Sequence, residues 1–178
     1  MKTTKKGFTL IELIVVIAII GVLAMILVPS MLGYVRKSKV SSANSAAAST
    51  QKAMNTALIE LDEEGADLST IPAKVTKADA GAAITLPGGK SATIEDKLRQ
   101  YMDDYNKTSF DFQARVNGGV CDACAATTDN IYPGTYPSGV VTADNVKKTY
   151  QSNGKANLDD AYTDCCKKAD DNKGEDNG

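Results

Sequence analysis

Residues 8–35 read FTLIELIVVIAIIGVLAMILVPSMLGYV, and this stretch decides how the rest of the chain can fold. Its only charged residue is Glu12, and the run from Leu13 to Val35 carries none. About 20 apolar residues are enough to cross a bilayer as a helix. Insertion of this segment is favourable by about 6–8 kcal/mol, which outweighs one carboxylate near the membrane edge. The stretch therefore predicts a membrane-inserted helix that begins near Phe8.

The remaining residues have a polar composition that suits one globular domain. The chain has 178 residues, a formal net charge of −2 and a sequence pI of about 5.2. This balance lacks the basic footprint of a nucleic-acid-binding protein, so no nucleic-acid partner is predicted. The chain contains no His, which is the commonest general base and zinc ligand. Because no nucleophile, base and orienting group can be assembled, we predict no enzymatic activity, no cofactor and no bound metal.

A basic leader precedes the apolar run. Three lysines lie within the first six residues, and Gly7 follows them. An ordinary signal peptide has a shorter apolar core with a small-residue cleavage site after it, whereas the small residue here comes before the core. Residues 5–13, which read KKGFTLIEL, resemble the leader junction of type IV pilins and type II secretion pseudopilins. Lysines and arginines flank both ends of the run, so the cytoplasmic placement of the N-terminus follows from this resemblance and the short leader.

The resemblance implies a processing and assembly route. A prepilin peptidase would cut after Gly7, and the new amino terminus at Phe8 would be N-methylated. The chain would be a single-pass cytoplasmic-membrane protein before an inner-membrane assembly platform adds it to an extracellular pilus, a homo-polymer of such subunits. The implied fold is α+β, with a long N-terminal helix and a small antiparallel-sheet head, the pilin lollipop.

Glu12 needs a partner. An acid in an otherwise apolar membrane segment marks a functional site. Leader cleavage would supply the α-amine of Phe8, and the first N–H groups of the helix also favour a negative charge. In a bundle of staggered helices, we expect Glu12 to neutralise the amine of a neighbouring copy and so set the axial register. The alternative is a side chain that merely extends to the membrane interface.

Gly21 and Pro29 are predicted helix-breaking positions. Proline lacks an N–H and clashes with the preceding turn, and glycine weakens a helix locally. In pilin-like filaments the corresponding span is often partly melted. For the isolated subunit we expect a gentle kink in an intact helix.

The helical pattern continues after Pro29 to about Glu63, so one helix from near Phe8 would extend about 80 Å. Apolar and small residues recur at gaps of three or four and predict one buried stripe: Val40, Ala43, Ala47, Thr50, Met54, Leu58 and Leu61. The polar residues between them, among them Asn44, Gln51 and Asn55, are assigned to the rest of the helix surface.

The chain is thus expected to have five parts. They are a leader (1–7), a transmembrane and assembly half-helix (8–35), an amphipathic half-helix packed on the head (36–64), a globular head (65–169) and a flexible acidic tail (170–178). Within the head, the patterns predict a strand and turn at 84–89, a helix capped by Thr93, a strand over 110–116, a hairpin turn at 117–119, turns at 132–134 and 136–139, and a short strand at 140–141.

The head contains four cysteines, Cys121, Cys124, Cys165 and Cys166. Three interpretations are open: a zinc site, a redox motif at Cys121–Cys124, or two disulfides. An even number of cysteines in an exported domain favours disulfides that join the first pair to the second in either order. Closing a loop of about 40 residues stabilises by roughly 3–4 kcal/mol. The arrangement resembles the disulfide-bounded C-terminal loop of many pilins.

Three functions are considered. The first is a structural subunit of an extracellular type IV pilus that serves adhesion, motility, aggregation or DNA uptake. The second is a pseudopilin of a type II secretion or competence system. The third is a membrane-anchored surface binding protein that never polymerises.

Overall fold

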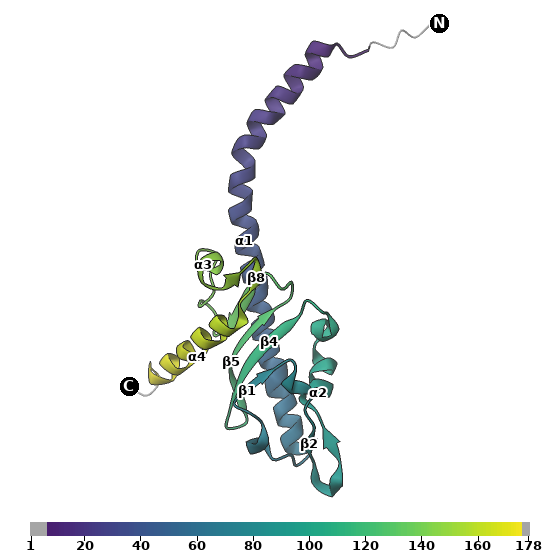
Figure 1. The fold of residues 1–178 in the computed structure, drawn as a ribbon, viewed down its shortest axis with the longest axis vertical. Coiled ribbons are helices and arrows are strands. Elements are labelled where there is room, and N and C mark those ends of the chain that lie inside the picture. Colours follow the sequence, from purple (N-terminus) through teal and green to yellow (C-terminus); the bar gives the residue numbers. More distant parts are fainter. Residues whose placement is uncertain (1–6, 176–178) are drawn as a thin grey trace, which may run out of the picture. The chain divides into compact units, whose positions relative to one another are not determined.

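The computed structural model of the protein describes residues 7–175. The chain forms two compact units, one ending at Arg36 and one beginning at Lys37. The predicted α+β class, with a long N-terminal helix and a small antiparallel sheet, is confirmed. The helices and strands in chain order are (Figure 1) α1 (Leu10–Glu63), η1 (Leu68–Thr70), β1 (Lys74–Thr76), η2 (Asp79–Gly81), β2 (Ile84–Thr85), η3 (Pro87–Gly89), β3 (Ser91–Ala92), α2 (Ile94–Tyr101), η4 (Asp103–Asn106), β4 (Asp111–Asn117), β5 (Val120–Thr127), β6 (Pro133–Tyr136), α3 (Val146–Thr149), β7 (Gln151–Ser152), β8 (Lys155–Ala156) and α4 (Leu158–Glu175).

The N-terminal unit is built on the first part of α1, whose side chains up to Val35 are exposed. α1 runs without interruption through Gly21 and Pro29, so the helix break predicted at these residues is not present in this structure. Pro29 removes one backbone N–H, but the neighbouring turns keep their own bonds. Ser30 Oγ also donates a hydrogen bond to the Leu27 carbonyl at 2.9 Å. α1 is thus one continuous helix in this structure, and the expected gentle kink stays a prediction.

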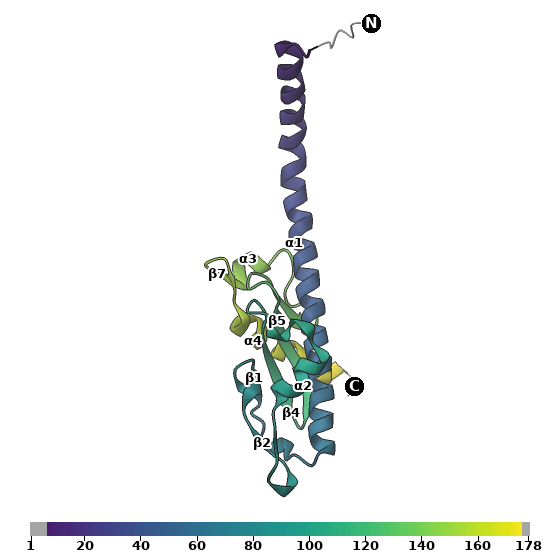
Figure 2. The ribbon, with the colours of Figure 1, turned by 90° about the vertical axis from the view of Figure 1, so that its right-hand side faces the viewer.

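The second half of α1 packs on the sheet, and Figure 2 shows it running along the strands. All seven residues of the predicted stripe are buried, together with Ala53 and Ala57. Small residues in this stripe let the backbone of β6 come very close. A Cβ added at Gly134 would lie 2.0 Å from the carbonyl carbon of Ala43 and 2.2 Å from the backbone nitrogen of Asn44. Only glycine fits at this crossing.

Three amide side chains of α1 hydrogen-bond the backbone of the sheet, which corrects their assignment to the free helix surface. Asn55 Oδ1 accepts from the Cys121 N–H at 2.7 Å, while Asn55 Nδ2 and Gln51 Nε2 donate to the Cys121 carbonyl at 3.1 and 2.8 Å. Asn44 Oδ1 accepts from the Thr135 N–H at 2.8 Å. Gaps of seven and four place the three amides on one side of the helix. They satisfy backbone groups that the strands leave unpaired.

The main sheet is antiparallel, with strand order β1-β4-β5-β6. β4 and β5 form a hairpin in which Asn117 pairs with Val120, so the turn is Gly118–Gly119. Both glycines have positive φ, 59° and 79°, as a type I′ turn requires. The strand and hairpin turn predicted for this region are confirmed.

β6 replaces one of the two turns predicted for this region. Instead of a turn at 132–134, Pro133–Tyr136 pairs with β5 as an edge strand, whereas the turn predicted at 136–139 is present at residues 138–139. Proline has no N–H to donate to a neighbouring strand. It is tolerated here because Pro133 is the first residue of β6, and β6 lies at the edge of the sheet. The short strand predicted at 140–141 is wrong, since neither residue lies in a strand and Val141 is buried in the core instead.

Several of the shorter predicted elements are present in the structure. The strand at Ile84–Thr85 and the turn at Pro87–Gly89 are present, with β3 as the partner of β2. Thr93 caps α2 as predicted, because its Oγ1 accepts from the Asp96 N–H at 3.0 Å. A further hairpin, β7–β8, turns at Asn153–Gly154 with positive φ at both residues.

The C-terminal helix α4 was not predicted. Its buried face consists of Leu158, Ala161, Cys165 and Ala169, at gaps of three and four. The prediction of a flexible tail from residue 170 is wrong as far as Glu175, because those residues continue α4. The leader residues 1–6 and the last residues, 176–178, lie outside the described part of the chain.

Gly134→Ala tests the close crossing of α1 and β6. The added methyl group overlaps backbone atoms that cannot rotate away, so we expect a loss of at least about 2 kcal/mol in the free energy of unfolding. Tyrosine fluorescence during urea unfolding of the full chain in detergent measures it. Gly81→Ala is the matched control, because its Cβ would meet only the flexible carboxylate of Glu95, at 2.8 Å. Equal stability of the two variants would contradict the account.

Candidate functional site

The residues predicted for leader processing lie at the start of α1. Gly7 and Phe8 precede the first helical residue, and both are exposed. A Cβ at Gly7 would meet no atom within 4 Å. The Gly7–Phe8 bond is thus in an open, non-helical segment.

Glu12 forms a capping box with Thr9. The Thr9 N–H and Thr9 Oγ1 donate to Glu12 Oε2 at 2.8 and 2.7 Å, and the Glu12 N–H donates back to Thr9 Oγ1 at 3.3 Å. This arrangement satisfies two backbone donors at the helix start and orients the carboxylate. The pattern Thr-x-x-Glu could have been recognised in the sequence. Both bonds from Thr9 end on Oε2, which leaves Oε1 for a further donor.

The apolar residues that follow are exposed along their whole length. Phe8, Leu10 and Ile11 are 87%, 76% and 69% exposed, and exposed apolar side chains continue to Val35. Apolar surface of this extent marks a site of contact with membrane or protein. By length and composition, α1 is apolar enough to cross a membrane.

The cysteines occupy two adjoining elements of the head. Cys121 and Cys124 lie on β5, and Cys165 and Cys166 lie on α4, which packs against β5. Three of them are buried and Cys166 is half-buried; all four are free thiols in this structure. The predicted pairings between the two elements therefore stay predictions.

A bulge in β5 decides which way the first cysteine pair points. The register shifts so that Arg115 pairs with Ala123 and Val116 with Cys121, which leaves Asp122 unpaired in the strand ladder. Residues three apart in a regular strand face opposite sides, but the extra residue cancels the offset. Cys121 and Cys124 consequently share the core that α1 covers, whereas Cys165 belongs to a second core with the alanines of β5 at 123 and 125.

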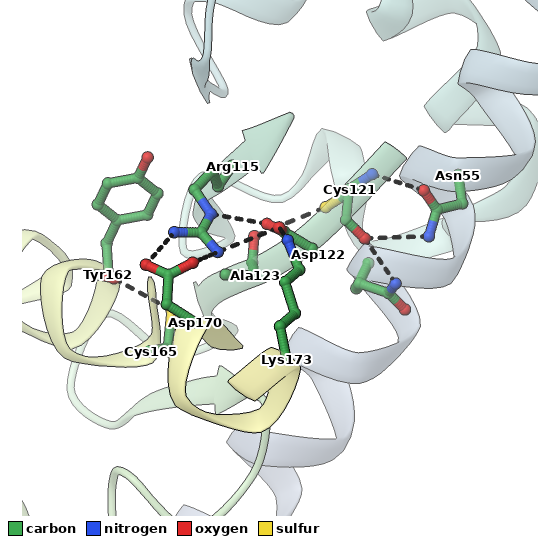
Figure 3. Close-up of polar contacts among 10 residues, drawn as sticks. Asn55, Arg115, Cys121, Asp122, Ala123, Tyr162, Cys165, Asp170 and Lys173 are labelled. Atoms are coloured by element: carbon green, nitrogen blue, oxygen red, sulfur yellow. Dashed lines mark hydrogen bonds and ion pairs between the residues drawn. The ribbon is translucent and has the colours of Figure 1, made fainter. Parts of the chain in front are cut away.

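The displaced Asp122 anchors α4 through an ion-pair network (Figure 3). Arg115 Nε donates to Asp122 Oδ1 at 2.7 Å, and its two terminal nitrogens donate to Asp170 at 3.0 and 2.8 Å. Lys173 Nζ donates to Asp122 Oδ2 at 2.6 Å. The Arg115 and Asp122 side chains are only 17% and 14% exposed. One arginine thus joins β4, the bulge of β5 and the last turns of α4.

Burial and charge shift the titrations of this region. Burial alone would raise the pKa of Asp122, but its bonds with Arg115 and Lys173 outweigh burial and hold that pKa below its usual range. Burial raises the pKa of Cys121 to about 12 and that of Cys124 well above its ordinary value. Since the thiolate is the nucleophile, these two thiols are poorly suited to redox exchange. These titrations therefore give no support to a redox role for the C-x-x-C spacing.

The zinc interpretation receives no support from the geometry. Within residues 7–175, no group of three or more His, Cys, Asp or Glu side chains is arranged to hold a metal ion.

Comparison with known proteins defines the class of the N-terminal segment. Residues 2–28 match the family model described as the prokaryotic N-terminal methylation motif. The resemblance to type IV pilins is thereby confirmed over this part of the chain.

Particular relatives extend the match beyond the leader. The chain is 45% identical over 67 residues to the type IV major fimbrial protein FimA of Dichelobacter nodosus, covering 38% of this chain and 42% of the relative. It is 41% identical over 88 residues to the fimbrial protein EcpC of Eikenella corrodens, covering 49% and 52%. It is 46% identical over 56 residues to the type IV major alpha-pilin of Moraxella bovis, covering 32% and 35%. The chain thus spans between about a third and a half of the length of these relatives, and no solved structure gave a significant match.

Arg115→Ala tests the anchor of α4. Loss of charge-assisted hydrogen bonds to two carboxylates is expected to lower the free energy of unfolding by about 1–3 kcal/mol. The same change should expose the amides of residues 165–175 to faster hydrogen exchange, measured by mass spectrometry. Lys167→Ala is the control, because it removes only an exposed pair with Asp164, whose contribution is about 0–1 kcal/mol. Unchanged exchange in α4 of the Arg115 variant would contradict the anchoring role.

Proposed function

We propose that this chain is the precursor of a structural subunit of an extracellular type IV pilus. The observation that carries the proposal is the methylation-motif match over residues 2–28, which continues into a fully exposed apolar helix. Such a helix needs lipid before assembly and other protein afterwards. The names of the relatives, major fimbrial protein and major alpha-pilin, support the same function.

The processing steps follow from the open leader junction. Prepilin peptidase cuts the exposed Gly7–Phe8 bond, and the amine released at Phe8 is then N-methylated. The precursor is a single-pass cytoplasmic-membrane protein, and the assembly platform moves its helix from lipid into the filament. The filament then serves adhesion, motility, aggregation or DNA uptake.

Glu12 sets the register of the filament in this proposal. Its Oε2 caps the helix of its own chain through Thr9. Its Oε1 accepts the methylated amine of Phe8 from a neighbouring copy. A carboxylate buried among apolar helices is costly without a cation, so only the register that brings an amine to Glu12 is stable.

Two further features belong to the proposed mature subunit. Gly21 and Pro29 allow the helix to open locally once it leaves the membrane, because both weaken the hydrogen-bond ladder. Disulfides that join Cys121 and Cys124 to Cys165 and Cys166 would fix α4 to β5 in the oxidising exterior.

The mature N-terminus gives the most direct test. Mass spectrometry of protein sheared from the cell surface is expected to show a chain that begins with N-methylated Phe8. Surface-localised protein that retains Met1 would overturn both the pilin and the pseudopilin proposals. Correct processing without long fibres, together with a requirement for secretion of other proteins, would favour the pseudopilin instead.

Substitution of Glu12 separates its charge from its capping bond. Glu12→Gln keeps an oxygen that can accept from Thr9 but loses the negative charge, whereas Glu12→Ala loses both. Both variants are expected to reduce sheared surface fibres at least about tenfold, since a lost pair at this site exceeds about 1.4 kcal/mol. Immunoblots of the sheared and membrane fractions measure the effect. Normal fibre yield from Glu12→Gln would show that capping alone suffices and would refute the charge pairing.

A further inference from the structure

The last turn of α1 carries charge of the wrong sign for its own stability. Asp62 and Glu63 lie there, and the turn contains no basic residue. The C-terminal end of a helix carries partial negative charge, so carboxylates at this end are unfavourable. Both side chains are exposed, and neither takes part in an ion pair within residues 7–175. An external cation would remove this repulsion.

A groove of about 720 Å³ opens beside these acids. Its lining includes Asp62 and Asp67, the apolar residues Leu58, Ile59 and Leu68, and the polar turn at 117–119. The Asp67 carboxylate already accepts hydrogen bonds from Ser69, which leaves Asp62 as the free acid of the groove. Ile59 is 59% exposed, although it belongs to the helix that forms the core. A groove that combines apolar side chains with an unpaired acid suits a lysine, whose stem is apolar and whose tip is charged. We call this surface the acidic groove.

The opposite end of the head carries unpaired lysines. Lys37, Lys147 and Lys148 are exposed, and none of them joins an ion pair among the described residues. Val40 and Val146 share one buried cluster, which places α3 beside this turn of α1. We call the three lysines the lysine end. Along α1, 26 residues separate Lys37 from Glu63, which corresponds to about 39 Å at 1.5 Å per residue.

We propose that the lysine end of one copy binds the acidic groove of a copy further along the filament than the one whose Phe8 meets Glu12, an inference that rests on the proposed polymeric function. The two surfaces have opposite charge, and within one head they are too far apart to meet. Of the acids near this end, Asp129 is paired with Lys39, Asp164 accepts from Tyr150, and Asp144 lines the same groove as Lys37. The lysine end nevertheless presents three exposed lysines. A contact between two different surfaces of identical chains is heterologous, and repetition of such a contact builds an open filament.

Zero-length carbodiimide cross-linking of whole cells that express the full chain tests the contact. The expected product joins Lys147 or Lys148 to Asp62 or Glu63, identified by mass spectrometry. Val146 of α3 shares a buried cluster with Val40, and 22 residues of α1, about 33 Å, separate Val40 from Asp62, so this product is expected to join two copies. Its absence from both the membrane fraction and sheared surface fibres would overturn the inference.

Charge reversal supplies the second test. Lys147→Glu with Lys148→Glu, and separately Asp62→Lys with Glu63→Lys, are each expected to lower fibre yield at least about fivefold. The four changes together should restore the yield to within about twofold of the unaltered chain. Lys52→Glu with Lys90→Glu is the matched control, since both lysines are exposed and unpaired among the described residues.

The stability of the single chain distinguishes lost contact from lost folding. Asp62→Lys with Glu63→Lys places cations at a helix C-terminus, so its melting temperature in detergent should stay equal or rise. Fibres of normal yield from both reversed pairs would refute the docking contact and leave the pilus proposal intact. Failure of the unaltered chain to form any fibre would refute the pilus proposal, and the cross-link in the membrane fraction would then decide the contact alone.

Discussion

The head depends on a backbone-to-backbone contact between α1 and β6. Gly134 leaves no space for a side chain against Ala43, and the small residues of the α1 stripe continue this close approach. At such a distance the helix can also hydrogen-bond the strands directly. Three amide side chains of α1 make such hydrogen bonds. Asn44 bonds the backbone of the edge strand β6, and Gln51 and Asn55 bond the backbone of β5 at the bulge. The contact thus positions the sheet by sterics and by hydrogen bonds at once.

The bulge in β5 connects this packing to the C-terminal helix. One extra residue places both cysteines of the first pair in the core that α1 covers and leaves Asp122 available for Arg115. Arg115 also holds Asp170, so α4 is fixed by the same residue that marks the irregularity of the sheet. The bulge in β5 therefore helps to hold α4 on a head that has few large apolar side chains. The largest apolar side chains of the head core form an aromatic cluster, Tyr105, Phe110 and Phe112. Their ring centroids lie 6.0–6.4 Å apart.

The two halves of α1 differ in which of their faces are apolar. Residues 10–35 of α1 are apolar on every side, whereas the buried stripe from Val40 to Leu61 occupies one face only. The all-round apolar segment has no core of its own within the described residues and requires lipid or other copies. The capping box at Thr9 and Glu12 begins the helix next to the proposed processing site, so the acid proposed to pair with a neighbouring copy also caps its own helix. In the proposed filament, charged groups on the head surface would add specificity to an association that apolar contact alone leaves unspecific.

Much of the fold was accessible from the sequence because its signals are local. The α1 span, its buried stripe, the Thr93 cap and the Asn117-Gly118-Gly119 hairpin each follow from periodicity or from turn chemistry over a few residues. β6 was missed because proline and glycine normally predict turns. Its strand conformation depends on pairing with β5 and packing against α1, which are contacts between residues far apart in the chain. The sequence of α4 has apolar residues at helical spacing: Leu158, Ala161, Cys165 and Ala169. Its otherwise polar composition hid this pattern, and its contact with Arg115 through Asp170 is visible only in the structure. By itself the sequence determined the long apolar helix, the methylation motif at its start and its lone acid. The tertiary structure alone decided which core holds each cysteine, which amides reach the sheet and why Gly134 has no side chain, because each depends on contacts between residues far apart in the chain.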